Sequence, residues 1–360
     1  MWYSTISPAP VGLQHSGPSS DHLTLGPGIG AHHLSDIMKI LNTFLAGLAT
    51  CLATFHVQAA DDIVRLGNLK FAHYGAVSYM KEIAPKCGIK LEERFFAKGL
   101  DIMPAMIAGE IDLAASAADA AIASRAAGVP IYAVAGFARG GARIVAGKGS
   151  GMTSVRQLKG RKVGVARGGA QELLLLAELA QNQLSWSDQP GRDVQIFYMP
   201  FADLNQALMQ KQIDAIAQSE PQASQAINKG FGDEVMKPYD TPMGEPVRTL
   251  VMTEKLYANK PLADKVMKCF VMATKAFIEN PQLAESYVRG NMFKHQITAD
   301  DFQDAIGNSP YTYDLTVEHI QVTTDFMAKY GVGKMKTPPL AKDWVKLDLL
   351  TQTKTSLGVK

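Results

Sequence analysis

After residue 61 the chain alternates short runs of apolar and β-branched residues with stretches whose apolar positions recur at helical spacing. Strand-type runs lie at 62–70, 89–96, 111–116, 130–138 and 161–166, and helical patterns lie at 76–88, 101–110 and 119–128. Short strands that alternate with helices are typical of βαβ units. The pattern therefore predicts an α/β fold with mainly parallel sheets.

One strand–helix–strand unit occurs twice. FFAKGLDIMPAMIAGEIDLAAS begins at Phe95, and FYMPFADLNQALMQKQIDAIAQ begins at Phe197. The two segments align without a gap at an offset of 102 residues (213 − 111 = 102), which matches Ile111-Asp112 to Ile213-Asp214. Such patterns also recur by chance, but the long gapless alignment favours two related α/β domains.

Four loops follow strands of the two halves, and we expect them to face one another. Ligands of open parallel sheets bind beyond the carboxyl ends of the strands, near helix N-termini. The loops at those positions are 72–76, 115–119, 167–171 and 218–221. The doubled pattern therefore predicts an interdomain ligand cleft.

The pattern changes after about residue 237. The segment EPVRTLVMTEKLYANK (245–260) has the pattern of a strand that re-enters the first domain, and the remaining chain is mostly helical and is expected to pack on that domain. The chain would then cross between domains twice, which makes a hinge. We predict that domain 1 comprises residues 61–142 and 248–360, and domain 2 residues 143–247.

An apolar segment near the N-terminus predicts the compartment. MKILNTFLAGLATCLATFHVQAADD (38–62) has one early lysine, an apolar core and small residues before Ala59. These are the features of a secretory signal peptide at 38–59 that is cut after Ala59. The alternative, a membrane anchor, is disfavoured because the core is short and rich in Ala and Thr. We therefore expect a periplasmic protein.

The residues upstream of this segment have no periodicity. Residues 1–37 are rich in Gly, Pro, Ser and His, so we interpret them as an extension ahead of a start at Met38, the alternatives being a start at Met1 and a disordered tail. Cys51 is a poor candidate for lipid attachment, because Thr50 replaces the smaller residue expected before it.

Composition narrows the range of partners. The 360 residues have 47% hydrophobic and 19% charged residues and a net charge of +2, with no basic run that would suggest nucleic acid. His73, His295 and His319 are too scattered for a zinc site, so we expect no metal and no cofactor. Cys87 and Cys269 could form a disulfide in an oxidising compartment, but buried single thiols are favoured. The expected partner is a small molecule.

The sequence offers no catalytic motif. It contains neither a G-x-S-x-G nucleophile motif nor an H-E-x-x-H metalloprotease motif, and no Cys-centred motif is present. We therefore predict a protein that is not an enzyme.

The stretch VGVARGGAQELLLL (163–176) is the clearest candidate for solute contact. Glycines between a strand and a helix let the backbone approach a ligand, and the first N–H groups of the helix favour an anion. The guanidinium of Arg167 can bind a carboxylate or sulfonate through two hydrogen bonds. The spacing matches no nucleotide fingerprint, and a simple tight turn is the alternative. The candidate contacts are Arg167, Gly168, Gly169 and Ala170.

Further candidates follow other strands. His73 and Tyr74 come after the first strand, where an imidazole and an aromatic ring suit hydrogen bonding or stacking. Ser116 and Ala117 belong to the loop at 115–119, where Ser116 can contact solute or, with Asp119, cap the next helix.

The segment GFARGGARIVAG (136–147) places charged and aromatic candidates near the expected hinge. It contains Phe137 and Arg143 among glycines. Phe137 can stack on a ring, and Arg143 can bind an anion, although a purely structural role is open for each.

Three segments together resemble a known family. SVRQLKGRKVGVARGGAQELLL, VQIFYMPFADLNQALMQKQIDAIAQSEPQASQAI and VRTLVMTEKLYANKP are similar to the periplasmic solute-binding proteins of ABC transporters, of the nitrate/sulfonate/taurine type. The resemblance runs from about Ile63 to about Gln282. It implies the type II periplasmic binding protein fold, with two α/β domains, a hinge and an interdomain ligand cleft.

The resemblance also singles out two charged residues. Glu220 belongs to its acidic-Pro pair and can accept a ligand amine, pair with a cleft arginine or cap a helix. Arg248 begins the return strand, where this family often places an arginine near the ligand. Ser219 stands where many members carry an aromatic residue, which predicts a more open or more polar pocket wall.

We therefore predict the solute-binding component of an ABC importer. It would act as a monomer, capture a small organic anion such as a sulfonate, taurine-like or carboxylate solute, and deliver it to the permease and its ATPase. One alternative is a pyrimidine-precursor-binding protein or an enzyme of the same fold, with His73, Tyr74 and Phe137 stacked on the ring. The cysteine-rich iron motif of a related pyrimidine-synthesising enzyme is absent. The other alternative is a solute sensor.

Overall fold

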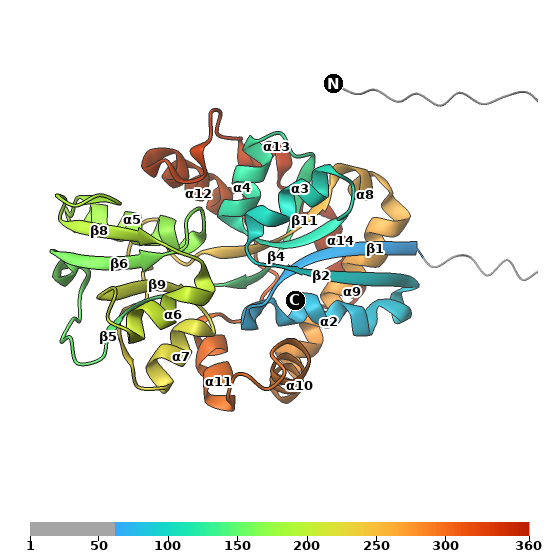
Figure 1. Ribbon diagram of the computed structural model, residues 1–360. Helices are drawn as coiled ribbons and strands as arrows, with labels where there is room; N and C mark the ends of the chain where they lie inside the picture. Colours follow the sequence, from blue (N-terminus) through green and yellow to red (C-terminus); the bar gives the residue numbers. More distant parts are fainter. Residues whose placement is uncertain (1–61, 360) are drawn as a thin grey trace, which may run out of the picture. The chain divides into compact units, whose positions relative to one another are not determined.

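The computed structural model describes residues 62–359, which form two α/β lobes (Figure 1). The predicted extension, signal peptide and Cys51 lie outside the described residues. Within residues 62–359, no helix combines the length and apolar character needed to cross a membrane.

The first lobe is built on a five-stranded sheet. Its strand order is β2-β1-β3-β11-β4. The strands are β1 (Asp62–Leu69), β2 (Ile89–Phe96), β3 (Leu113–Ala117), β4 (Ile131–Arg139) and β11 (Val247–Thr253). Helices α2 (Gly75–Ile83), α3 (Ile102–Ile107) and α4 (Ala118–Ala126) connect the first four strands.

The second lobe is built on a six-stranded sheet in the order β10-β5-β9-β6-β8-β7. The strands are β5 (Ala142–Gly147), β6 (Arg161–Val165), β7 (Trp186–Ser187), β8 (Val194–Tyr198), β9 (Ala215–Ser219) and β10 (Gly232–Met236). Helices α5 (Ala170–Gln181), α6 (Phe201–Met209) and α7 (Gln222–Asn228) lie between them.

The repeated sequence corresponds to a repeated structure. β1 pairs in parallel with β2 and β3, and β6 pairs in parallel with β8 and β9. The Ile-Asp step has the same role in both copies. The Asp112 carboxylate accepts a hydrogen bond from the Arg65 backbone N–H at 3.0 Å, and the Asp214 carboxylate accepts one from the Lys162 backbone N–H at 2.8 Å. These aspartates thus join the third strand of each unit to its first.

Both sheets are mainly parallel, as the pattern predicts, but each contains one strand that runs against the others. β11 is antiparallel to β3 and β4, and β5 is antiparallel to β9 and β10. The physical reason is the crossing between lobes. A strand that starts at the cleft runs away from it, opposite to the strands that end there.

The first crossing needs glycine. Gly140 and Gly141 join β4 to β5 with φ angles of +68° and +78°. A Cβ atom on Gly140 would lie 2.3 Å from the Asn308 carbonyl oxygen. The turn therefore combines the left-handed region with a close backbone approach, which only glycine tolerates.

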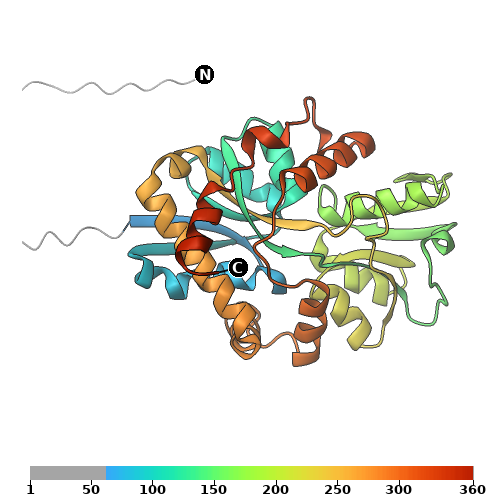
Figure 2. The same cartoon turned by 180° about the vertical axis from the view of Figure 1, so that it is seen from behind.

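The C-terminal third contacts both lobes. It comprises α8 (Glu254–Ala258), α9 (Lys260–Glu279), α10 (Pro281–Tyr287), α11 (Ala299–Asn308), α12 (Val317–Tyr330), α13 (Ala341–Trp344) and α14 (Asp348–Ser356). The long helix α9 packs on α2, as expected, and Figure 2 shows it along the rear of the first lobe. However, α11 also contacts α7, and α12 also contacts α5. The C-terminal third therefore packs on both lobes, and not on the first lobe alone as the sequence pattern predicts.

The two cysteines are free, buried thiols in this structure. Cys269 lies on α9, and its thiol donates to the Met80 carbonyl oxygen at 3.7 Å. Their burial agrees with the favoured expectation from sequence.

Candidate functional site

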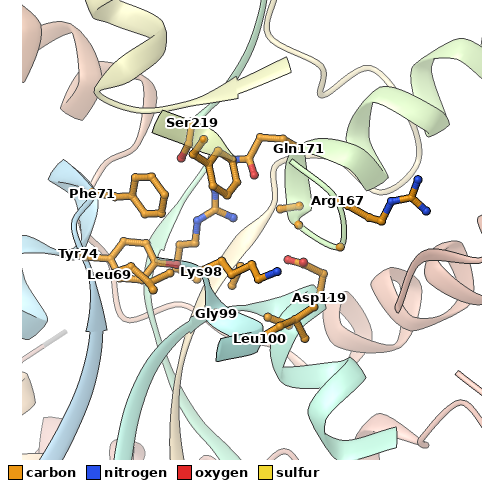
Figure 3. A pocket seen from close by; sticks show the side chains of 17 residues that line it. Leu69, Phe71, Tyr74, Lys98, Gly99, Leu100, Asp119, Arg167, Gln171 and Ser219 are labelled. Carbon is orange, nitrogen blue, oxygen red and sulfur yellow. The ribbon is translucent and has the colours of Figure 1, made fainter. Parts of the chain in front are cut away.

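A cavity of about 40 Å³ lies at the strand ends where the two lobes meet (Figure 3). All four loops expected at a cleft contribute to its lining or border it. The side chains and backbone that line it belong to Leu69, Phe71, Tyr74, Lys98, Gly99, Leu100, Ala117, Asp119, Ala120, Arg167, Gly168, Gly169, Ala170, Gln171, Phe201, Ser219 and Arg248. A wider groove of about 410 Å³ adjoins the cavity and shares Lys98, Arg167 and Phe201 with it.

Arg248 is a buried cation in this cavity. It lies on β11 and is 2% exposed. Its Nε donates to His73 Nε2 at 3.1 Å, and its Nη2 donates to the Gly140 carbonyl oxygen at 3.0 Å. Its Nη1 has no hydrogen-bond partner among residues 62–359. The guanidinium is therefore held in place by uncharged groups and keeps one donor free.

His73 orients Arg248 and does not line the cavity. It is fully buried, and burial together with the nearby guanidinium of Arg248 holds its pKa well below the usual 6.5. The ring is therefore neutral, which lets Nε2 accept the hydrogen bond from Arg248. The Phe71 ring stacks on it, with centroids 5.8 Å apart and planes 11° from parallel.

Asp119 is a buried carboxylate in the same cavity. It is the second residue of α4 and is 2% exposed. Neither carboxylate oxygen accepts a hydrogen bond from another side chain in the described part of the chain, although the backbone N–H groups of Asp119 and Ala120 act on the carboxylate and lower its pKa. Burial raises its pKa to about 6, although the guanidinium of Arg248 opposes the rise. Figure 3 shows the carboxylate directed toward the middle of the lining side chains.

Aromatic rings form one wall of the cavity. Phe71 of the first lobe meets Phe201 of the second edge to face, with centroids 5.5 Å apart. Tyr74 lines the cavity and packs its ring edgewise on Phe137, 4.8 Å away. Phe137 is fully buried behind Tyr74. Of Tyr74 and Phe137, only Tyr74 can therefore contact a ring in the cavity.

The 167–170 loop lines the cavity mainly with backbone. Gly168 has a φ of +77°, and a Cβ on it would lie 2.9 Å from Cδ1 of Leu100 in the first lobe. The Arg167 side chain instead stacks on the Tyr198 ring, 3.6 Å from its centroid, and lies 3.4 Å from Asp188. Figure 3 shows its guanidinium turned away from the other labelled side chains.

Five of the predicted ligand residues do not line the cavity. They are His73, Ser116, Phe137, Arg143 and Glu220. Ser116 neither caps α4 nor faces the cavity, because Ala117 occupies the N-cap position and the Ser116 hydroxyl donates to the Ala117 carbonyl oxygen. The other seven, Tyr74, Ala117, Arg167, Gly168, Gly169, Ala170 and Arg248, do line it.

Arg143 is fully engaged in ion pairs. Its guanidinium donates to Glu220 at 2.6 Å, to Glu234 at 2.6 Å and to Asp304 at 2.7 Å. Burial would lower its pKa, but these carboxylates outweigh burial and raise it. Because Asp304 lies on α11, this cluster joins the second lobe to the C-terminal third.

Glu220 is equally satisfied. One oxygen accepts from Arg143 and from Asn308, and the other accepts from the Ser224 backbone N–H and hydroxyl within α7. Glu220 therefore pairs with an arginine and caps a helix, two of the alternatives that the sequence leaves open. No free acceptor remains for a ligand amine.

Comparison with known families identifies the family of this chain. The profile described as "NMT1/THI5 like" matches residues 86–284, more than half of the sequence. The chain belongs to the NMT1/THI5-like family. A comparison with curated protein sequences gave no match.

Solved structures share the fold of this NMT1/THI5-like protein. The alkanesulfonate-binding protein SsuA from Xanthomonas axonopodis pv. citri, bound to MOPS, has a TM-score of 0.66 at 19% identity over 80% of this chain and 99% of its own. The aliphatic sulphonate-binding SsuA from Escherichia coli has a TM-score of 0.67 at 20% identity, covering 79% and 92%. The nitrate-binding NrtA from Synechocystis PCC 6803 has a TM-score of 0.68 at 16% identity, covering 83% and 89%. Their common fold is the type II periplasmic binding protein fold.

Sequence reasoning missed two loops of the NMT1/THI5-like cavity. Lys98, Gly99 and Leu100 follow β2, and Phe201 follows β8. The signal was present in the repeat, because Gly99 and Phe201 are separated by the repeat offset of 102 residues (201 − 99 = 102). For Asp119 the sequence indicates only a helix-capping role, because its spacing gives no sign that its carboxylate lacks a side-chain partner.

Proposed function

We propose that this protein is the extracytoplasmic solute-binding component of an ABC importer. It would capture a small organic anion, either a sulfonate or a carboxylate, between the two lobes and deliver it to a permease and its ATPase. The family membership and the fold shared with sulfonate- and nitrate-binding proteins support the class. The predicted signal peptide supports a periplasmic location, and we propose the sequence-derived domain limits as the bodies that close around the solute.

The buried guanidinium of Arg248 is the observation that favours an anionic solute. Its hydrogen bonds go to a neutral imidazole and a carbonyl, and it makes no ion-pair contact with any described residue. A buried charge without a contacting counterion costs free energy, and an anion placed against Nη1 reduces that cost. Lys98 adds a positive charge at both the cavity and the groove, whereas the carboxylate of Asp119 lines the cavity and that of Asp101 lines the groove.

Titration calorimetry with a panel of solutes tests the proposal. We expect ethanesulfonate, propanoate or their substituted forms to bind, and an Arg248→Met variant to lose about 100-fold or more in affinity, since a charged hydrogen bond left unmade costs about 3 kcal/mol. Arg167→Ala is the matched control. Its guanidinium points away from the cavity, so its affinity should change less than about threefold. Binding of neutral or cationic solutes alone would contradict the proposal.

The aromatic wall favours a second candidate ligand, a flat heterocycle. Phe71, Tyr74 and Phe201 could face a ring, although His73 and Phe137, on which the sequence-based alternative rests, lie behind the wall. A pyrimidine in the same panel tests this alternative. Genes for a permease and an ATPase beside this one would separate transport from sensing.

A further inference from the structure

Asp119 and Arg248 have opposite charges and line the same small cavity, but they do not form an ion pair. Each residue is only 2% exposed, and the cavity has a volume of about 40 Å³. Nη1 of Arg248 and both carboxylate oxygens of Asp119 have no side-chain partner in the described part of the chain. A space of this size holds only about three water molecules, so a solute group placed against Nη1 also lies close to the carboxylate.

Two other cations of the cavity lining are paired with carboxylates of their own. Lys98, which follows β2, lies 3.8 Å from Asp101. Arg167, which precedes α5, lies 3.4 Å from Asp188. Neither cation therefore balances the charge of Asp119.

The remaining neighbours of Asp119 also leave its charge unbalanced. Glu172, in the first turn of α5, adds a second negative charge, and Tyr74 is neutral because burial raises its pKa. A space of about 10 Å³ beside Asp119 is otherwise lined by uncharged residues alone, among them Met243 and, from α12, Thr323. Burial consequently raises the pKa of Asp119 to about 6, against the guanidinium on β11 and the backbone N–H groups at the start of α4.

A solute anion changes the preferred state of Asp119. Its negative charge, held by Arg248, disfavours a second buried negative charge beside it and so favours protonation of the carboxylate. An ionised carboxylate only accepts hydrogen bonds and repels the anion, whereas a protonated carboxyl has one O–H that can donate to it. One proton therefore converts Asp119 from a group that repels the anion into a second donor for it.

We infer that Asp119 binds the anionic solute as a neutral carboxylic acid, so that capture of the solute takes up one proton from the solvent. The inference rests on the proposed function and adds to it a second binding residue and a pH dependence. The proton goes to one carboxylate oxygen of Asp119, and this O–H donates to an oxygen of the anion. Nη1 of Arg248 donates to the same anionic group, and no covalent bond of the solute changes.

The proton determines how affinity depends on pH. Below about pH 6 Asp119 carries the proton in the empty protein as well, so affinity should not change with pH there. Above pH 6 the empty protein has lost the proton and must regain it on binding, so affinity should fall by up to about tenfold per pH unit. A site in which Arg248 alone binds the anion would show no such change, because a guanidinium does not titrate in this range.

Titration calorimetry on the mature chain measures both the affinity and the proton. Ethanesulfonate and propanoate serve as probes, because both are ionised from pH 6 upward and cannot supply the proton themselves. We expect the affinity for the probes to be at least about tenfold weaker at pH 8 than at pH 6. At pH 7.5, titrations in two buffers of different ionisation enthalpy should show the uptake of about one proton per chain.

Variants assign the proton to Asp119. The amide of Asp119→Asn keeps a donor for the anion but does not titrate, so its affinity should agree at pH 6 and pH 8 within about twofold, without proton uptake. At pH 8 it should bind the probes at least about fivefold more tightly than the wild type. Glu172→Gln is the matched control, because it removes a neighbouring negative charge but keeps an acceptor for the Gly168 backbone N–H. It should retain the proton uptake.

The outcomes separate this inference from the proposed function. Binding of the probes with equal affinity at pH 6 and pH 8, without proton uptake, would overturn the role of Asp119 and leave the anion-binding function standing. Proton uptake that persists in Asp119→Asn would also overturn it, because another group would then carry the proton. Binding of neutral or cationic solutes alone at every pH from 5 to 8 would overturn the anion-binding function itself. The wild-type titrations need no variant, so a variant that fails to fold does not remove the test.

Discussion

At the scale of single residues, the partners of a buried side chain determine its role. Arg143 and Arg248 are both buried arginines on strands that begin at the cleft. Three carboxylates surround Arg143, whereas Arg248 is held by an imidazole and a carbonyl. Arg143 consequently belongs to a structural cluster of ion pairs, whereas Arg248 keeps its Nη1 donor available for a solute.

Asp119 gives a prediction for the pH dependence of stability. Its pKa is about 6 in the fold against an ordinary value of 3.8, so the folded state binds this proton more tightly than the unfolded state. The stabilisation is therefore complete below pH 3.8 and is lost as pH rises through 6, at a cost of about 3 kcal/mol. Without ligand, Asp119→Asn should unfold several degrees above the wild type at pH 8, and the difference should shrink toward zero near pH 4.

Calorimetry of both proteins at the two pH values measures this effect. His73, whose depressed pKa makes the fold lose stability as pH falls below 6.5, contributes equally to both proteins and cancels in the difference. A difference in unfolding temperature that is the same at pH 4 and pH 8 would show that the ionisation of Asp119 is not its cause.

Sequence could place the strand ends of the site but not the direction of each side chain. Arg248 and the 167–170 loop follow from the pattern and the family resemblance. The exclusion of Arg143 from the cavity could not be predicted, because its partner Asp304 is 161 residues away. Whether the Asp119 carboxylate has a side-chain partner likewise depends on all the elements packed around it. No local sequence pattern contains that information.

At the scale of elements, the strands and their mainly parallel direction were predicted, but the one reversed strand in each sheet was not. The predicted strand at 89–96 coincides with β2, and most other strands differ by one or two residues at each end. Local alternation of apolar residues contains this information. The antiparallel insertion of β11 between β3 and β4 does not appear in any local pattern, since it depends on where the chain crosses between lobes.

The loop before α5 gives a prediction at this scale. Gly168→Ala should destabilise the protein by about 1 kcal/mol, because alanine is strained at a φ of +77°. It should also weaken solute binding about threefold to tenfold, since the new Cβ displaces Leu100 across the cleft from its preferred rotamer. Thermal unfolding and calorimetry measure the two effects.

Gly230→Ala is the matched control for this loop. Gly230 has a φ of +74°, and a Cβ on it would meet no atom within 4 Å. It should lose the same stability while keeping full affinity. Equal loss of affinity in both variants would show that strain in the second lobe, and not the contact with Leu100, controls binding.

At the scale of the whole described chain, the lobes touch around the cavity. The edge-to-face contact of Phe71 with Phe201 joins the first lobe to the second. If solute binding closes the lobes, this contact belongs to the bound state, and an aromatic pair of this kind is worth about 1 kcal/mol beyond its buried area.

A double-mutant cycle on affinity tests this contact. Phe71→Ala and Phe201→Ala should each weaken binding of the tightest solute in the panel. Together they should cost about 1 kcal/mol less than the sum of the single effects, since the pair can be lost only once. Strictly additive losses would mean that each ring contacts solute independently and that the contact between lobes does not contribute to closure.

The central position of β11 sets an order of assembly during synthesis. All strands of the second sheet lie between residues 142 and 236, so that sheet can be complete while the rest of the chain is still being made. The first sheet cannot join β4 to β3 until residues 247–253 have emerged. Domains that are continuous in sequence commonly fold as units ahead of later segments. The strand that completes the first sheet also carries Arg248. The nascent chain therefore gains this buried arginine only when the sheet of the first lobe is complete.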